Sequence, residues 1–166
     1  FREARRRGAT WVEIDVKLTA DGVPIVMHDS SLKRTTGVDR LASEMRASEL
    51  PPSVPTFEQA IACFGELGLG CNVEIKPCEG READTARVTV ETLRRLWPAT
   101  LPAPLLSSFK DRSLAMALEV APEFAPQERC RCFALVRRSI RMKRAQAGGR
   151  SRSRASITRS ATWARR

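Results

Sequence analysis

The stretch WVEIDVKLTADGVPIVMHD, residues 11–29, decides the fold, because it predicts a strand, a tight turn and a second short strand. In its first half, Glu13 and Asp15 alternate with apolar residues, and side chains two positions apart in a strand lie on the same face. The D-G dipeptide at residues 21–22 is a strong turn signal, and the strand after it is predicted to end at His28, the only histidine of the chain. The stretch therefore places two carboxylates on one strand face and a titratable ring a short distance further on.

Strands and helices alternate along the rest of the chain. A helix is expected to end at Gly8, a loop is expected over residues 35–39, and the proline-rich residues 48–55 lead into a helix that Thr56 can cap and Gly68 can end. Alternation at this spacing predicts a parallel sheet with crossover helices, and hence an α/β fold. The other predicted strands are 71–76 and 103–109, and the predicted helices are 57–67, 81–97 and 111–121.

Positive charge is concentrated at one end of the chain. The net charge of +10 arises from 29 Lys or Arg against 19 Asp or Glu. Residues 129–166 hold 13 of the basic side chains and no acidic one, so residues 1–128 carry 16 basic and 19 acidic side chains. After about residue 127 the sequence is rich in Arg, Ser and Ala and has neither strand nor helix periodicity. We therefore expect a domain over residues 1–127 and a basic, low-complexity, disordered tail over residues 128–166.

Cysteine content and hydropathy indicate the compartment. The five cysteines are an odd number without a CxxC pair, in a chain much longer than small disulfide-stapled domains. Reduced thiols and a cytoplasmic location are expected. The chain has no run of about 18 apolar residues, so no membrane span is expected.

Two carboxylates on one strand face need compensation if that face is buried. Both faces of a parallel strand are usually covered, and unpaired buried carboxylates cost several kcal/mol. A divalent cation would compensate Glu13 and Asp15, and Glu74, near the C-terminal end of the strand predicted over residues 71–76, supplies a third carboxylate. Lys76, two positions further on the same face, would place a positive charge beside the cation, suited to an anionic phosphate oxygen.

Other interpretations fit the same spacing. An acidic pair is also typical of an edge strand or a half-exposed face, so Glu13 and Asp15 could simply be solvated. His28 could be a turn or packing histidine, and Glu74 with Lys76 could be surface charge. Spacing alone leaves these alternatives open.

Five blocks of sequence give a more specific pattern. They are GATWVEIDVKLTADGVPIVMHDSSLKRTT, VPTFEQAI, NVEIKP, LLSSF and APEF. In this order and at these separations, over residues 1–127, they resemble the glycerophosphodiester phosphodiesterase family. The family's motif is a Glu-x-Asp strand, a D-G turn, a His-Asp pair followed by an arginine and threonines, a Pro-Thr helix start and a Glu-Ile-Lys strand. The matching residues are Glu13, Asp15, Asp21, Gly22, His28, Asp29, Arg34, Thr35, Thr36, Pro55, Thr56, Glu74, Ile75 and Lys76.

The resemblance implies a TIM-type (β/α)8 barrel with its site at the C-terminal ends of the strands. Glu13, Asp15 and Glu74 would hold one Mg²⁺ or Ca²⁺, which would bind a phosphate oxygen of a small-molecule glycerophosphodiester. Lys76 would neutralise the same phosphate. His28 would be one of two acid/base histidines, because the ordinary pKa of histidine, about 6.5, lies near working pH. The implied reaction is hydrolysis to glycerol 3-phosphate and an alcohol such as choline or ethanolamine.

The family pattern is incomplete in this chain. Domains of the family open with a His-Arg-Gly strand and a Pro-Glu-Asn-Thr segment, and neither is present. The first catalytic histidine and its arginine are therefore missing, and the family's last strands have no counterpart in residues 129–166. We expect a partial barrel, truncated at its N-terminus, that cannot close.

The basic tail has two interpretations. Its 13 positive charges, with Trp163 available for stacking, would suit a nucleic-acid arm. We favour translation out of frame, because the pattern is lost abruptly where the resemblance stops, and nucleic acid is then not expected as a partner. The alternatives to a hydrolase are an inactive fragment or a basic nucleic-acid-binding protein, and a lipid-headgroup phospholipase D relative shares the barrel.

Overall fold

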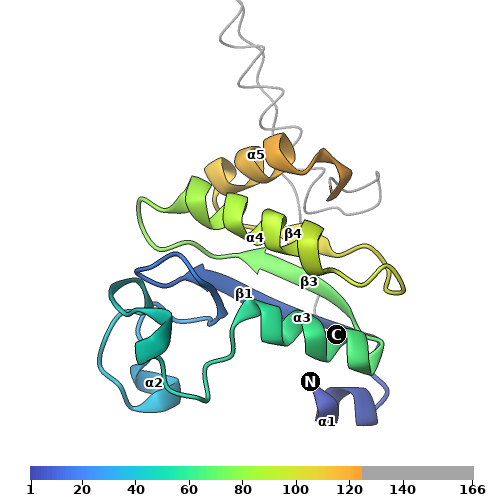
Figure 1. Cartoon of the computed structure of the whole chain (residues 1–166), viewed down its shortest axis with the longest axis horizontal. Coiled ribbons are helices and arrows are strands. Elements are labelled where there is room, and N and C mark those ends of the chain that lie inside the picture. The colour runs from blue at the N-terminus through green and yellow to red at the C-terminus, as the bar shows by residue number, and fades with distance from the viewer. Residues whose placement is uncertain (125–166) are drawn as a thin grey trace, which may run out of the picture.

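The computed structural model describes residues 1–124, in which four strands form one sheet in the order β2-β1-β3-β4 (Figure 1). β1 (Trp11–Leu18) pairs in parallel with β3 (Gly70–Ile75), and β3 pairs in parallel with β4 (Leu105–Ser107). β2 (Pro24–Val26) pairs antiparallel with the end of β1. The predicted α/β class is confirmed, and the parallel strands with their crossover helices match the expected partial barrel.

The helices follow the predicted pattern closely. α3 has the predicted bounds because its caps are local: the Gln59 backbone N–H donates to Thr56 Oγ1 at 3.2 Å, and Gly68 ends the helix with a φ of 65°. The helices are α1 (Arg2–Arg6), α2 (Lys33–Thr36), α3 (Phe57–Leu67), α4 (Glu82–Leu96) and α5 (Asp111–Val120), with short 3₁₀ turns at Ala42–Glu44, Ala47–Glu49 and Pro122–Phe124.

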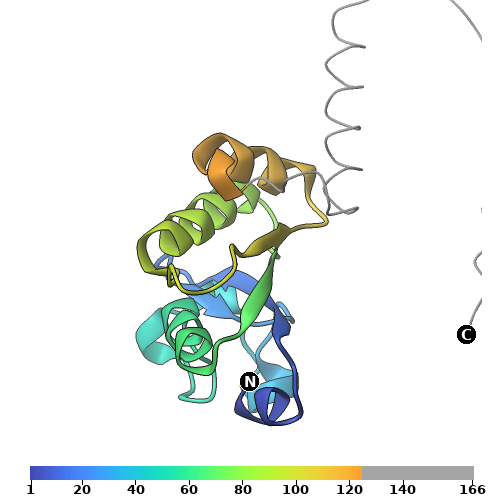
Figure 2. The ribbon, with the colours of Figure 1, turned by 90° about the vertical axis from the view of Figure 1, so that its right-hand side faces the viewer.

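The main core lies between the sheet and the helices on one side of it. Figure 2 shows α3 and α4 on the same side of β1 and β3. Alternate residues of the strands point into this layer, as the period of two requires. The fully buried apolar side chains in the core include Val16, Phe57, Phe64, Val73, Ile75, Val90 and Leu93. The other face of β1 and β3 is therefore left for the polar side chains.

A second, smaller core supports the loops that follow β1. Its members all lie between residues 25 and 54, and they pack together apart from the main core. This packing holds the segment from His28 to Thr36 near the end of β1. The buried residues of this cluster are Ile25, Met27, Leu32, Ala42, Met45 and Val54.

The structure differs from the predicted pattern in three places. β2 is antiparallel to β1, as the tight-turn signal between them favours, whereas the alternation of strands and helices along the chain predicted parallel pairing; the five residues 19–23 are too few for the crossover that a parallel pair needs. β2 ends at Val26 and not at His28, and β4 spans three residues where 103–109 was predicted. Thr35 and Thr36 close the short helix α2, where a loop was predicted.

Two further expectations concern the C-terminal tail and membrane-spanning helices. The predicted disordered tail, residues 128–166, lies outside the described residues. Within residues 1–124, no helix combines the length and the apolar character that crossing a membrane requires.

Candidate functional site

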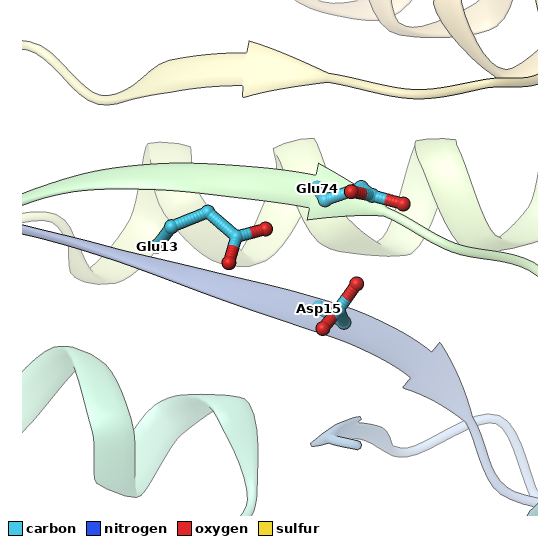
Figure 3. A group of neighbouring side chains, drawn as sticks. All are labelled: Glu13, Asp15 and Glu74. Atoms are coloured by element: carbon cyan, nitrogen blue, oxygen red, sulfur yellow. The ribbon is translucent and has the colours of Figure 1, made fainter. Parts of the chain in front are cut away.

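Three carboxylates meet on the polar face of β1 and β3. Asp15 is the register partner of Glu74, and Glu13 precedes Asp15 on the same face (Figure 3). One oxygen from each of Glu13, Asp15 and Glu74 lies within 4.8 Å of the other two. The three residues that the sequence predicted as metal ligands are therefore brought together on one face of two neighbouring parallel strands, with Asp15 and Glu74 in the C-terminal halves of these strands.

The cluster has the properties of a site that takes a cation. Oε1 of Glu74 is buried and has no hydrogen-bond partner. Burial, and then the neighbouring charges of Asp15 and Glu74, raise the pKa of Glu13. A buried oxygen without a hydrogen bond, within an all-carboxylate set, fits a hard divalent cation such as Mg²⁺ or Ca²⁺.

The acidic face is less buried than the sequence suggested. Glu13 is exposed, and Asp15 and Glu74 are half-buried, whereas a parallel strand was expected to be covered on both faces. The physical reason is that the described strands form an open sheet of four, so this face is not enclosed on all sides.

Lys76 lies directly beside two of the carboxylates. Its Nζ is 3.0 Å from Oδ1 of Asp15 and 3.8 Å from Oε1 of Glu74. The Lys76 backbone N–H donates to the carbonyl of Val16 at 3.0 Å, which fixes the residue just beyond the end of β3. An ammonium at this position can attract an anion that approaches the carboxylate cluster.

His28 belongs to a short chain of polar contacts. Its Nδ1 lies 2.7 Å from Oδ1 of Asp29, and Nε of Arg34 donates to Oδ2 of Asp29 at 2.5 Å. Arg34 first, and then His28, lower the pKa of Asp29 to about 2. Because Asp29 engages Nδ1, Nε2 is the ring atom left to exchange a proton.

A cavity joins this histidine to the carboxylates. Its volume is about 340 Å³, and Glu13, Asp15, His28 and Arg34 all line it. Hydroxyl and apolar side chains complete the wall, among them Thr36, Ser53, Val26 and Val54. His28 therefore shares this cavity with Glu13 and Asp15, whereas Glu74 does not line it.

Lys17 is a site-facing residue that the sequence reasoning missed. It is 2% exposed, and its Nζ donates to the carbonyl oxygen of Lys76 at 3.1 Å. Burial is the largest cause that lowers its pKa. The signal was available, because Glu13, Asp15 and Lys17 are two residues apart in one strand and so share a face.

Comparison with known proteins matches most of this chain to one family model. Residues 1–126 match the model of the glycerophosphoryl diester phosphodiesterase family. A phosphodiesterase from Oleispira antarctica, solved in complex with the product sn-glycerol-3-phosphate, is 34% identical with a TM-score of 0.72, over 87% of this chain and 63% of that one.

Two curated relatives are also similar. A Mycobacterium tuberculosis protein named probable glycerophosphodiester phosphodiesterase 2 is 30% identical over 127 residues, which are 72% of this chain and 45% of that protein. Human glycerophosphodiester phosphodiesterase 1 is 35% identical over 78 residues, which are 37% of this chain and 24% of that protein. The chain thus spans between about a quarter and a half of the length of these relatives.

Proposed function

The chain belongs to the glycerophosphoryl diester phosphodiesterase family, and from this premise we propose that its site hydrolyses a glycerophosphodiester with one divalent cation bound. The observation that carries the proposal is the convergence of Glu13, Asp15 and Glu74, whose oxygens lie within 4.8 Å of one another. Lys76 adds the positive charge that an incoming phosphate requires.

Different residues of the site would bind the cation and the substrate. Glu13, Asp15 and Glu74 would hold Mg²⁺ or Ca²⁺, and the ammonium of Lys76 would neutralise a phosphate oxygen. When bound, the cation would polarise the phosphoryl group and orient the diester.

His28 would exchange a proton with an oxygen of the reacting phosphodiester. Arg34 holds Asp29 ionised, and Asp29 holds Nδ1 of the imidazole, so that Nε2 stays available to donate or accept a proton. The shared cavity supports this role, because it connects the ring to Glu13 and Asp15.

The proposed substrate is a glycerophosphodiester, and the proposed products are sn-glycerol 3-phosphate and an alcohol. The similar Oleispira phosphodiesterase was solved with sn-glycerol-3-phosphate as its product, which supports this class of substrate. A cytoplasmic location is part of the same proposal. Cys63, Cys71 and Cys78 are free thiols, as expected in a reducing compartment.

The test is release of sn-glycerol 3-phosphate from glycerophosphocholine by the 166-residue chain, with and without Mg²⁺ or Ca²⁺. We expect cation-dependent release that falls at least 100-fold in Glu13→Gln. Asp39→Asn is the matched control, because Asp39 pairs with Lys33 on the surface, outside the cavity and the carboxylate cluster. Equal activity of E13Q and the wild type would refute the assignment of the cation site.

A further inference from the structure

We propose that Lys17 is a positioning residue of this site, whose ammonium holds the main chain at Lys76 so that the Lys76 side chain stays beside Asp15 and Glu74. The inference rests on the proposed function, since it assigns Lys76 to the phosphate. It adds a residue that does not itself touch the cation or the substrate.

Lys17 is almost fully buried, which is unusual for a lysine. The residue is 2% exposed, and lysine is rarely buried unless its charge is paired. Its backbone pairs with Ile25 of β2, and its side chain reaches across to the residue that follows β3. Only the carbonyl of Lys76, at 3.1 Å, accepts a hydrogen bond from it among the contacts of residues 1–124. The buried ammonium therefore makes a single hydrogen bond within residues 1–124, and that bond is to the main chain of the proposed phosphate-binding residue.

The peptide groups of Lys76 are held on two sides by consecutive residues of β1. Its N–H donates to the carbonyl of Val16 at 3.0 Å, and its carbonyl accepts from Nζ of Lys17 at 3.1 Å. β3 ends at Ile75, so the second bond extends the attachment of the chain beyond the strand ladder. Without the Lys17 side chain, Lys76 would keep the first bond and lose the second.

A labelling experiment tests this link without cation or substrate. The full chain is treated with acetic anhydride, and the modification rates of Lys76 and Lys33 are measured by mass spectrometry. In Lys17→Met we expect the rate at Lys76 to rise several-fold, because the ammonium leaves Asp15 more often, while Lys33 in its surface pair with Asp39 stays unchanged.

Two further variants separate positioning from general destabilisation. Lys17→Arg keeps a long cationic donor and should hold the wild-type labelling rate. Arg81→Met is the matched control and should leave the labelling rate at Lys76 unchanged. Arg81 donates to the carbonyl of Thr19 at 2.6 Å and does not bond to Lys76. If Lys17→Met does not fold, Lys17→Gln, which is too short to span the same distance, replaces it. An unchanged rate at Lys76 in the folded variant overturns the proposal.

A binding experiment then relates the position of Lys76 to phosphate. Calorimetry measures the affinity for sn-glycerol 3-phosphate in the presence of Mg²⁺ or Ca²⁺. We expect Lys17→Met to weaken binding about 10-fold when it is introduced into the wild-type chain. Introduced into the Lys76→Met variant, it should weaken binding less than 2-fold, because Lys17 acts through Lys76. Equal losses in both backgrounds would show that Lys17 acts by its own charge, which overturns the proposal. A wild-type chain that binds neither cation nor sn-glycerol 3-phosphate would refute the proposed function, and the labelling result would still decide the role of Lys17.

Discussion

Asp15 and Glu74 are direct partners in the parallel register of β1 and β3. Neighbouring strands lie about 4.8 Å apart, so this pairing places two carboxylates side by side, and like charges in such positions destabilise a sheet. Lys76 lies beside both carboxylates but carries only one positive charge against two, and Glu13 adds a third negative charge. The site is therefore under electrostatic strain that a divalent cation would relieve.

Cation binding should stabilise the fold. A ligand that binds only the folded state at 100 times its Kd adds about 2.7 kcal/mol to the free energy of unfolding. We expect an increase of this size with Mg²⁺ or Ca²⁺ for the wild type and most of it to be lost in Glu74→Gln. Urea denaturation at neutral pH, with and without the cation, measures both values.

The control for this measurement is Asp39→Asn, which should keep the full stabilisation because Asp39 lies in a surface pair with Lys33. Equal stabilisation of the Glu74→Gln variant and the wild type would show that the cation binds elsewhere.

Removing Lys76 should make the fold more dependent on the cation. Lys76→Met leaves Asp15 without its 3.0 Å partner, and the side chains of Lys76 and Asp15 are 28% and 12% exposed, so we expect a loss of about 1–2 kcal/mol without cation. A divalent cation at fixed concentration should then stabilise the variant more than the wild type, because it no longer competes with the ammonium. Urea denaturation at a series of cation concentrations gives both the loss of stability without cation and the stabilisation by the cation. A smaller stabilisation by the cation in the variant would contradict the placement of Lys76 beside the cation site.

The contact between Asp29 and Arg34 should be visible as a pH dependence of stability. The pKa of Asp29 is about 2 in the folded chain, against about 3.9 for an ordinary aspartate. A carboxyl whose pKa is lowered by folding contributes stability above the unfolded value, and this contribution is lost as the pH falls through the folded value. The stability difference between wild type and Asp29→Asn should therefore be constant above about pH 5 and shrink between about pH 4 and pH 2.

Urea denaturation at a series of pH values tests this window. Arg34→Met should reproduce the behaviour of Asp29→Asn, because Arg34 is the largest cause of the lowered pKa. A difference that stays constant down to about pH 2 would mean that Asp29 is not held by this contact in solution.

The sequence could predict what depends on local rules. A period of two placed Glu13 and Asp15 on one face, and the capping chemistry of Thr56 and Gly68 set both ends of α3. The grouping of Glu74 with these two residues came from the resemblance of five sequence blocks to a known family, and the parallel register of β1 and β3 brings it beside Asp15.

What the sequence did not predict depends on contacts between distant segments. Lys17 becomes buried only once β1 has paired with β2 and β3 in the folded sheet. Its hydrogen bond to Lys76 joins residues 59 positions apart. α2 was missed because four residues are too few to show a helical period. The half-exposure of the acidic face likewise reflects how many strands lie side by side, which no short stretch of sequence encodes.

The register that pairs Asp15 with Glu74 begins with Trp11 opposite Gly70, and this pair offers a test of the strand alignment. A Cβ atom at Gly70 would lie 2.6 Å from the indole ring of Trp11, so Gly70→Ala must displace the ring. We expect a loss of about 1–2 kcal/mol in the wild type. In Trp11→Ala the same substitution should instead stabilise by about 0.5–1 kcal/mol, since glycine weakens a strand relative to alanine. A double-mutant cycle by urea denaturation measures the coupling, and additive effects of the two substitutions would contradict this register.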